Sequence, residues 1–267
     1  MTIGITPLGS GSRGNAFVIH SPDASILVDA GFSRKDLLAR MAAVGVIPEQ
    51  IKALLLTHEH EDHVRGCRLF CNQFDIPAYV TSSTMSYLEK KEMLSNRVLV
   101  FEPGEFFEIA GFRILPFAVQ HDAIDPVGFV ISKSGRSIAL ATDLGVVNGL
   151  TRQRLYDCDI LVLESNYDQE MLRNSQRQLH LKRRIMGRNG HLNNLDTVNS
   201  LPELLSERTS ALFLVHVSSE CNTYELVREL ARRKLHEMSR QDIFLQVVEQ
   251  SVPVPTYWLE AAGSLEI

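Results

Sequence analysis

Residues 54–63 read Leu54-Leu55-Leu56-Thr57-His58-Glu59-His60-Glu61-Asp62-His63, an apolar run that passes directly into histidines and carboxylates. The run predicts a short buried strand, and loops at strand ends commonly carry functional residues. Residues two apart in an extended segment point the same way, so His58 and His60 can share one metal ion. Asp62 and His63 begin the next helix and can turn towards a second ion. The alternative is a polar loop that is rich in histidine by chance, which such dense packing of ligand types disfavours.

Short apolar runs and helical patterns alternate along the rest of the chain. Strands are expected at residues 3–8, 16–19, 26–28, 54–56, 78–80, 160–163 and 212–215, and residues 98–140 are rich in strand patterns. Helices are expected from a capping box at Ser33 and Asp36 towards Gly45, and at residues 84–93, 194–207 and 224–236. The sequence therefore predicts a single mixed α/β domain over residues 1–267, with two sheets covered by helices.

The composition is that of an ordinary globular protein, with 45% hydrophobic and 22% charged residues. No apolar run approaches the roughly 18 residues that a membrane span needs, and no secretion signal is recognisable. Four scattered cysteines favour free thiols in a reducing compartment over a zinc ribbon: Cys67, Cys71, Cys158 and Cys221. We therefore expect a cytoplasmic protein without a membrane partner. The sequence carries no sign of its oligomeric state.

Positive charge is concentrated in one segment. The formal net charge is −5, from 27 Lys and Arg against 32 Asp and Glu. Residues 171–195 hold no acidic residue but six cations: Arg173, Arg177, Lys182, Arg183, Arg184 and Arg188. Without these six the chain has 21 basic against 32 acidic residues, a net charge of −11. Such a chain is not expected to coat nucleic acid over its whole surface, but it carries one basic insert.

The spacing His-x-His-x-Asp-His at residues 58–63 resembles the motif of the metallo-β-lactamase superfamily. The resemblance extends over nearly the whole chain and implies a four-layer αββα sandwich. It implies a ligand set with His58, His60 and His121 on one ion, Asp62, His63 and His216 on the other, and Asp143 bridging both. Asp29 matches a position whose carboxylate orients the histidine loop without binding metal. Taken singly, His121 and His216 would be ordinary histidines and Asp143 a helix cap, but all three follow apolar strands.

Two divalent ions held in this way lower the pKa of a shared water molecule and polarise the group that it attacks. The ligand set suits Zn²⁺ or Mn²⁺, and iron is also compatible. This chemistry permits hydrolysis of an ester, a thioester, an amide or a phosphodiester. Other residues must therefore indicate the substrate.

Two further residues resemble the nucleic-acid-processing branch of the superfamily, which includes ribonuclease Z and ribonuclease J. Glu164 follows an apolar strand, and His191 lies in Gly190-His191-Leu192-Asn193-Asn194. The resemblance implies that His191 contacts the scissile phosphate or protonates the leaving oxygen, with Glu164 orienting it. Asp62 is expected to act in catalysis as well as in metal binding. The alternative for His191 is a residue at a helix start with no chemistry.

The basic insert lies between Glu164 and His191, so its cations are expected near the mouth of the active site. There they would neutralise phosphates on either side of the cut bond. The candidate substrate-binding residues are Arg173, Arg177, Lys182, Arg183, Arg184 and Arg188, together with Asn193 beside His191. The alternative is a solvated helix face.

Within the superfamily the chain is most similar to the YycJ (WalJ) group. The shared stretches are residues 8–15, 121–123, 126–129, 190–194 and 216–222, while Tyr167 and Asn193 depart from the histidine and serine usual there. The resemblance implies a DNA exonuclease that works 5′ to 3′ in repair. Two alternatives stay open. One is a small-molecule cyclic phosphodiesterase with the same metal motif, and the other is a non-catalytic binding protein with a vestigial metal site.

Overall fold

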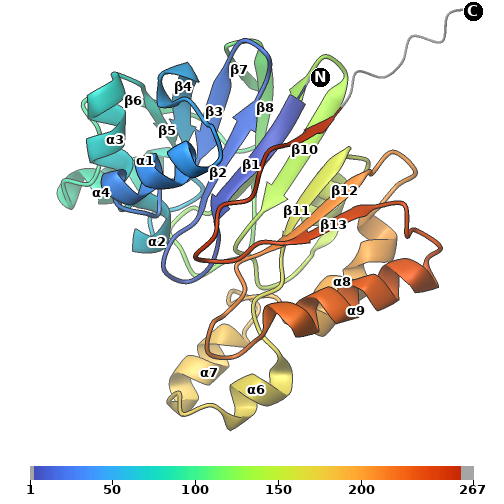
Figure 1. The fold of residues 1–267 in the computed structure, drawn as a ribbon. Coiled ribbons are helices and arrows are strands. Elements are labelled where there is room, and N and C mark those ends of the chain that lie inside the picture. Colours follow the sequence, from blue (N-terminus) through green and yellow to red (C-terminus); the bar gives the residue numbers. More distant parts are fainter. Residues whose placement is uncertain (1–2, 260–267) are drawn as a thin grey trace, which may run out of the picture.

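Two sheets pack face to face in the computed structural model, which describes residues 3–259 (Figure 1). The first described sheet has the order β14-β1-β2-β3-β4-β5-β6 and the second β13-β12-β11-β10-β9-β8-β7. The first sheet contains β1 (Ile3–Gly9), β2 (Ala16–His20), β3 (Ser25–Val28), β4 (Ile51–Leu55), β5 (Ala78–Val80), β6 (Val98–Val100) and β14 (Tyr257–Leu259). The second contains β7 (Phe107–Ile109), β8 (Phe112–Ala118), β9 (Val127–Lys133), β10 (Arg136–Ala141), β11 (Ile160–Glu164), β12 (Ala211–Val215) and β13 (Phe244–Val247).

Helices cover the outer face of each sheet, which confirms the four-layer αββα sandwich (Figure 1). The first sheet is covered by α1 (Arg34–Ala43), α3 (Cys67–Phe74) and α4 (Ser82–Lys90). The second is covered by α5 (Gly149–Leu155), α8 (Asn194–Leu204) and α9 (Tyr224–Glu237). Four short helices complete the described elements: a 3-10 turn at Pro48–Gln50, α2 (Glu61–Val64), α6 (Gln169–Asn174) and α7 (Leu179–Ile185). In Figure 1, α6 and α7 project below the sandwich.

The apolar runs of the sequence become three packed layers. Phe17, Phe129 and Phe213 belong to the layer between the sheets, and each is fully buried. Outside the sheets, Phe70 packs in the layer under α1, α3 and α4, and Leu201 in the layer under α8 and α9. Strands β11 and β12 are buried at every residue, which explains their continuous apolar sequences.

Strand direction brings the loops of interest to one edge. Strands β3 and β4 are parallel in the first sheet, and β10, β11 and β12 are parallel in the second. Strand β8 is antiparallel to β9, which is antiparallel to β10, so β8 points the same way as β10. The seven expected metal ligands and Glu164 lie at or just after the carboxyl ends of β4, β8, β10, β11 and β12. This is the edge where ligands bind in sheets of this kind.

The expected strands and helices are present, with ends that differ by at most three residues. Helix α4 begins two residues earlier and ends three residues earlier than expected from the sequence. The sequence did not predict α5, α6, α7, β13 or β14 as separate elements. The single domain over residues 1–267 stays a prediction, because residues 260–267 lie outside the described part.

Two further expectations concern membrane spans and cysteines. Within residues 3–259, no helix is long and apolar enough to cross a membrane. All four cysteines are buried free thiols.

Candidate metal centre and active site

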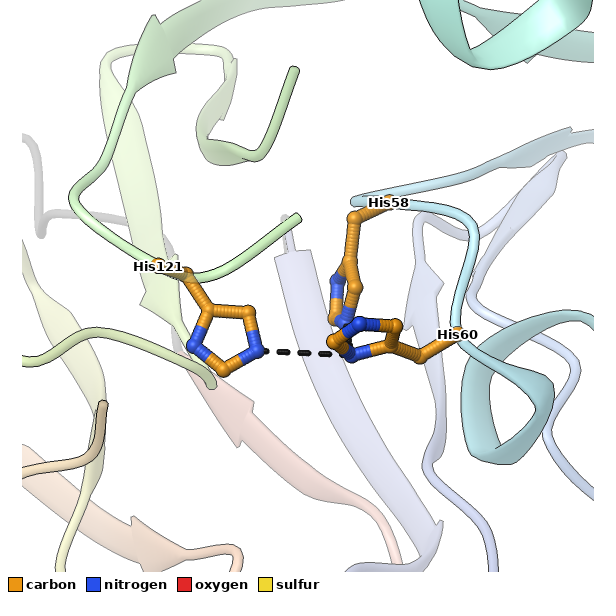
Figure 2. Close-up of side chains that lie close together, drawn as sticks. All are labelled: His58, His60 and His121. Carbon is orange, nitrogen blue, oxygen red and sulfur yellow. Dashed lines mark hydrogen bonds between the residues drawn. The ribbon is translucent and has the colours of Figure 1, made fainter. Parts of the chain in front are cut away.

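Three histidines point at one another from two loops (Figure 2). His58 and His60 come from the loop after β4, and His121 comes from the loop after β8. His58 Nε2 lies 3.0 Å from His60 Nδ1, and His121 Nε2 lies 3.4 Å from the same atom. Together they offer three nitrogens within 4.8 Å of one another. Convergent imidazole nitrogens of this kind fit a divalent cation.

A second group stands beside the first. Asp62 Oδ2 lies 3.7 Å from His63 Nε2 and 3.6 Å from His216 Nε2, so these three residues also offer ligand atoms within 4.8 Å of one another. Asp143 lies between the two groups, with Oδ2 3.2 Å from His63 Nε2 and Oδ1 3.7 Å from His121 Nε2. Among the described residues, Asp143 Oδ2 is buried and has no hydrogen-bond partner. This donor set fits two cations with a shared carboxylate.

Nearby charges and burial, respectively, lower the pKa values of Asp143 and His58, a carboxylate and an imidazole of these two groups. Burial raises the pKa of Asp143, but the His216 and His63 rings outweigh it and hold that pKa well below its usual value. Burial and the neighbouring His63 hold the pKa of His58 well below its usual value. An ionised carboxylate and a neutral imidazole are the forms that bind metal.

Asp29 supports the histidine loop, residues 57–63, through hydrogen bonds to its first and last residues. Its carboxylate accepts hydrogen bonds from Thr57 N at 2.9 Å and Thr57 Oγ1, and its Oδ2 lies 2.7 Å from His63 Nδ1. Asp29 is fully buried and adopts a positive φ of 58°, a conformation that is uncommon outside glycine but that Asp tolerates better than most residues. With Nδ1 of His63 engaged, Nε2 is directed into the site.

Glu164, at the end of β11, joins the candidate catalytic histidine to the candidate metal site. Its Oε1 lies 2.7 Å from His191 Nδ1 and 2.8 Å from His216 Nδ1. Its Oε2 accepts hydrogen bonds from the backbone N–H groups of Leu144 and Leu192. Burial lowers the pKa of His191, but the charge and hydrogen bond of Glu164 raise it above its usual value. The side chain of His191 is 20% exposed and faces a cavity beside the metal ligands.

Residues 24–217 match the family model of the Beta-lactamase superfamily domain. The chain belongs to this superfamily. It is 33% identical over 237 residues to the Exodeoxyribonuclease WalJ of Streptococcus pneumoniae serotype 2 (strain D39 / NCTC 7466), a match that covers 85% of this chain and 88% of the relative. It is 29% identical to the Exodeoxyribonuclease YycJ of Bacillus anthracis, covering 89% of this chain and 90% of the relative. The resemblance to the YycJ (WalJ) group is confirmed.

A solved structure supports the fold. The metallo-beta-lactamase fold protein YhfI from Bacillus subtilis superimposes with a TM-score of 0.72, covering 94% of this chain and 98% of YhfI. The two sequences are only 16% identical, so this likeness concerns the fold alone.

Three residues that were not among the predicted site residues contact the candidate metal ligands: Ser10, Asn15 and Asn166. Asn15 N donates to Asp62 O at 2.8 Å, and Asn15 Nδ2 lies 3.0 Å from His63 Nε2. Ser10 Oγ accepts from His216 N at 2.9 Å and donates to Asn15 Oδ1 at 2.7 Å. Asn166 Nδ2 donates to the carbonyl of His216 at 2.7 Å. The only signal for Ser10 and Asn15 was their place in the shared stretch at residues 8–15, which turn formation explains equally well.

Two cations of the basic insert reach the cavity of the superfamily site. Arg177 and Arg184 both line it together with His191. Arg177 Nε donates to Glu220 at 3.1 Å, and Arg184 forms an ion pair with Asp122, whose Oδ1 lies 3.5 Å from His121 Nε2. The sequence predicts these two arginines near the mouth of the site, and in the structure both line the cavity. Their contact with substrate stays a prediction.

The other expected substrate-binding residues are placed differently. Lys182 Nζ donates to the carbonyls of Arg173 and Ser175, at 2.6 and 2.7 Å, and so stabilises the insert itself. Asn193 is buried, and its side chain caps α8 by accepting from Asp196 N at 2.9 Å. Three arginines have exposed side chains and do not line the cavity: Arg173, Arg183 and Arg188. Arg183 and Arg188 line a neighbouring hollow with Asp122 and Arg184.

Proposed function

We propose that this chain is a metal-dependent exonuclease that removes nucleotides from DNA ends. The observation that carries the proposal is the Glu164–His191 pair, which stands beside a cluster of seven potential metal ligands and faces a cavity with two arginines. The name exodeoxyribonuclease of two relatives, each matched over most of its length, supports DNA as the substrate. The cation Arg184 is held in place beside the site by Asp122.

The metal site in this proposal holds two divalent ions, Zn²⁺ or Mn²⁺, with iron also compatible. The ligands are His58, His60, Asp62, His63, His121, Asp143 and His216, with Asp143 shared between the ions. When bound, the ions would activate a water molecule and polarise the scissile phosphate. Asp29 and Glu164 orient ligand histidines through Nδ1 and leave Nε2 for the metal.

The chain's own groups then carry the proton and the charge. His191, held through Nδ1 by Glu164, donates a proton from Nε2 to the leaving oxygen of the cut bond. Asp62 would act in catalysis as well as in metal binding, and the backbone N–H of Asn15 fixes its carbonyl. Arg177 and Arg184 neutralise phosphates that flank the bond.

The finer features of the proposal come from the resemblance to the YycJ (WalJ) group. They are 5′ to 3′ polarity and a part in DNA repair. The four free cysteines support a cytoplasmic location for this proposed nuclease. The small-molecule cyclic phosphodiesterase is the second candidate, because residues 3–259 contain no separate nucleic-acid clamp domain.

One experiment separates these candidates. Metal-loaded protein is incubated with end-labelled duplex DNA and, separately, with a cyclic phosphate ester. We expect stepwise loss of nucleotides from the DNA and little turnover of the cyclic ester. The absence of nucleotide release at any salt concentration would overturn the nuclease proposal. Metal analysis that returned no bound ion after metal-replete purification would instead favour the vestigial binding protein.

A further inference from the structure

The cavity over the metal site extends beyond the groups that hydrolysis needs. Its volume is about 230 Å³, and the polar part of its lining includes Asp143, His191 and His216. Another part of the lining is apolar and comes from α6, α7 and the loops beside them. This apolar wall consists of Leu181, which is partly exposed, and of four buried side chains: Tyr167, Leu172, Ile185 and Cys221. Phosphodiester hydrolysis as proposed above makes no use of it.

The apolar wall is tied to the loop that carries His191. His191 N donates to the carbonyl of Ile185 at 3.0 Å, and Gly190 N donates to the carbonyl of Gly187 at 2.9 Å. The backbones approach so closely that a Cβ on Gly190 would lie 2.1 Å from the Ile185 oxygen. A group bound on the apolar wall is therefore held at a defined distance from His191.

Two guanidinium groups lie in the same cavity as this wall. The guanidinium groups of Arg177 and Arg184 line the same cavity, and each is held by one acidic side chain, Glu220 or Asp122. A ligand that matches both features has a flat apolar part and an attached anion. A nucleotide has that composition, because every base offers an apolar face for contact with aromatic and aliphatic side chains.

We propose that the apolar wall binds the base of the terminal nucleotide while its phosphodiester lies at the metal site. This subsite rests on the nuclease function proposed above and adds the recognition of the base. A cavity of about 230 Å³ is smaller than most small-molecule sites, which have volumes of about 300–1,000 Å³, so it admits no more than one nucleotide. The terminal base must leave its stack to enter, as in other enzymes that act on an extruded nucleotide. Such a site favours release of mononucleotides from an end over cutting within a duplex.

The first test needs no variant. The metal-loaded wild-type protein is given strands that differ only in the terminal nucleotide of the digested end, which carries either a normal base or an abasic tetrahydrofuran residue. We expect kcat/KM for removal of that nucleotide to be about tenfold lower without the base, mainly through KM. Equal values for the two strands would overturn the subsite.

A pair of variants on one helix locates the effect. Leu181 lies in the apolar wall and is partly buried, whereas Leu179 on the same helix is 61% exposed and lies outside the cavity. We expect Leu181→Ala to reduce the tenfold preference for a terminal base to about threefold or less. Leu179→Ala is the matched control and should keep the full preference. Preservation in Leu181→Ala, or loss in both variants, would contradict the assignment of the wall.

A binding measurement separates this subsite from the nuclease function. Calorimetry of the metal-loaded protein compares deoxyadenosine 5′-monophosphate with 2-deoxyribose 5-phosphate, which lacks the base. We expect about tenfold tighter binding of the nucleotide. If the protein digests no DNA but keeps this difference, the nuclease function fails and the subsite stands. If it digests DNA but binds both compounds equally, the subsite fails and the nuclease function stands.

Discussion

At the scale of single residues, Glu164 links the candidate catalytic histidine to a candidate metal ligand. One oxygen of this buried carboxylate meets both His191 and His216, and the other accepts two backbone N–H groups. Replacing Glu164 would therefore disturb the candidate acid and a candidate metal ligand at once. His191 and Asp143 can be replaced separately, and they give cleaner tests of the two roles.

His191→Ala should leave both metal ions bound and slow turnover by on the order of 100-fold, because the leaving oxygen loses its proton donor. The measurement is kcat on labelled DNA together with metal content per chain. Removing the ring leaves Glu164 in contact with His216, so the metal site keeps its support. Loss of metal in step with activity would show that His191 is a ligand and not the acid.

Asp143→Asn tests the bridging carboxylate. The variant keeps the size of the side chain but removes the negative charge that lies between the two ligand groups. We expect metal content to fall to one ion per chain or fewer and turnover to disappear. Metal analysis by mass spectrometry and a DNA digestion assay provide the measurements. Full activity with two bound ions would refute the bridging role.

The candidate ligands at residues 58–63 were predictable from their dense spacing after an apolar strand, whereas His121, Asp143 and His216 were assigned through the resemblance to the metallo-β-lactamase superfamily. Ser10 and Asn166 were not predictable, because their contacts with His216 depend on loops that meet only in the folded chain. Asn193 and Lys182 are the opposite case, because the sequence predicted for them a role in substrate binding that their contacts do not support. Their residue types suggested substrate contact, but backbone groups nearby take up their hydrogen bonds.

At the scale of elements, the strands were easier to predict than the insert. Strands β11 and β12 are buried on both faces and so carry unbroken apolar runs. Helices α6 and α7 are six and seven residues long, and each buries a single residue, Leu172 and Ile185. Such short helices lack a readable apolar stripe and depend on tertiary contacts. Strand β14 was missed because only three residues form it, and pairing with β1 decides its structure.

Gly190 is the point where α7 meets the loop of His191, and Gly190→Ala tests that contact. The added Cβ would lie 2.1 Å from the carbonyl oxygen of Ile185 and 2.4 Å from that of Arg184, so the helix must move. We expect a loss of about 1–3 kcal/mol in unfolding free energy, and a fall in kcat as His191 shifts. Denaturant unfolding and digestion kinetics measure the two effects.

Gly149→Ala is the control for that substitution. Gly149 begins α5, and a Cβ built there meets nothing within 4 Å. Its replacement should leave kcat nearly unchanged and raise the unfolding free energy by about 0.4–1 kcal/mol. Equal behaviour of the two variants would mean that α7 adapts freely to Gly190→Ala and that the close approach has no functional weight.

At the scale of the whole molecule, the sandwich also buries a histidine that lies outside the candidate site, His20. Asn15, just before β2, contacts the metal-site residue His63, whereas His20 ends the same strand. His20 is 7% exposed, with Nε2 2.8 Å from Thr6 Oγ1 and Nδ1 2.9 Å from Ser25 Oγ. Nothing in the sequence singles out His20, because its hydroxyl partners lie on the two neighbouring strands, β1 and β3.

Burial lowers the pKa of His20 from 6.5 to about 4, so the folded state keeps this ring neutral. Between these two values the unfolded chain binds the extra proton, and stability therefore falls as the pH decreases. From pH 7 to pH 5 we expect His20 to contribute a loss of about 2 kcal/mol in unfolding free energy. Denaturant unfolding of the wild type and of His20→Gln at both pH values isolates this contribution, since all other titrating groups are shared. A wild type and a variant with the same pH dependence would show that His20 is charged in the folded protein or reaches solvent.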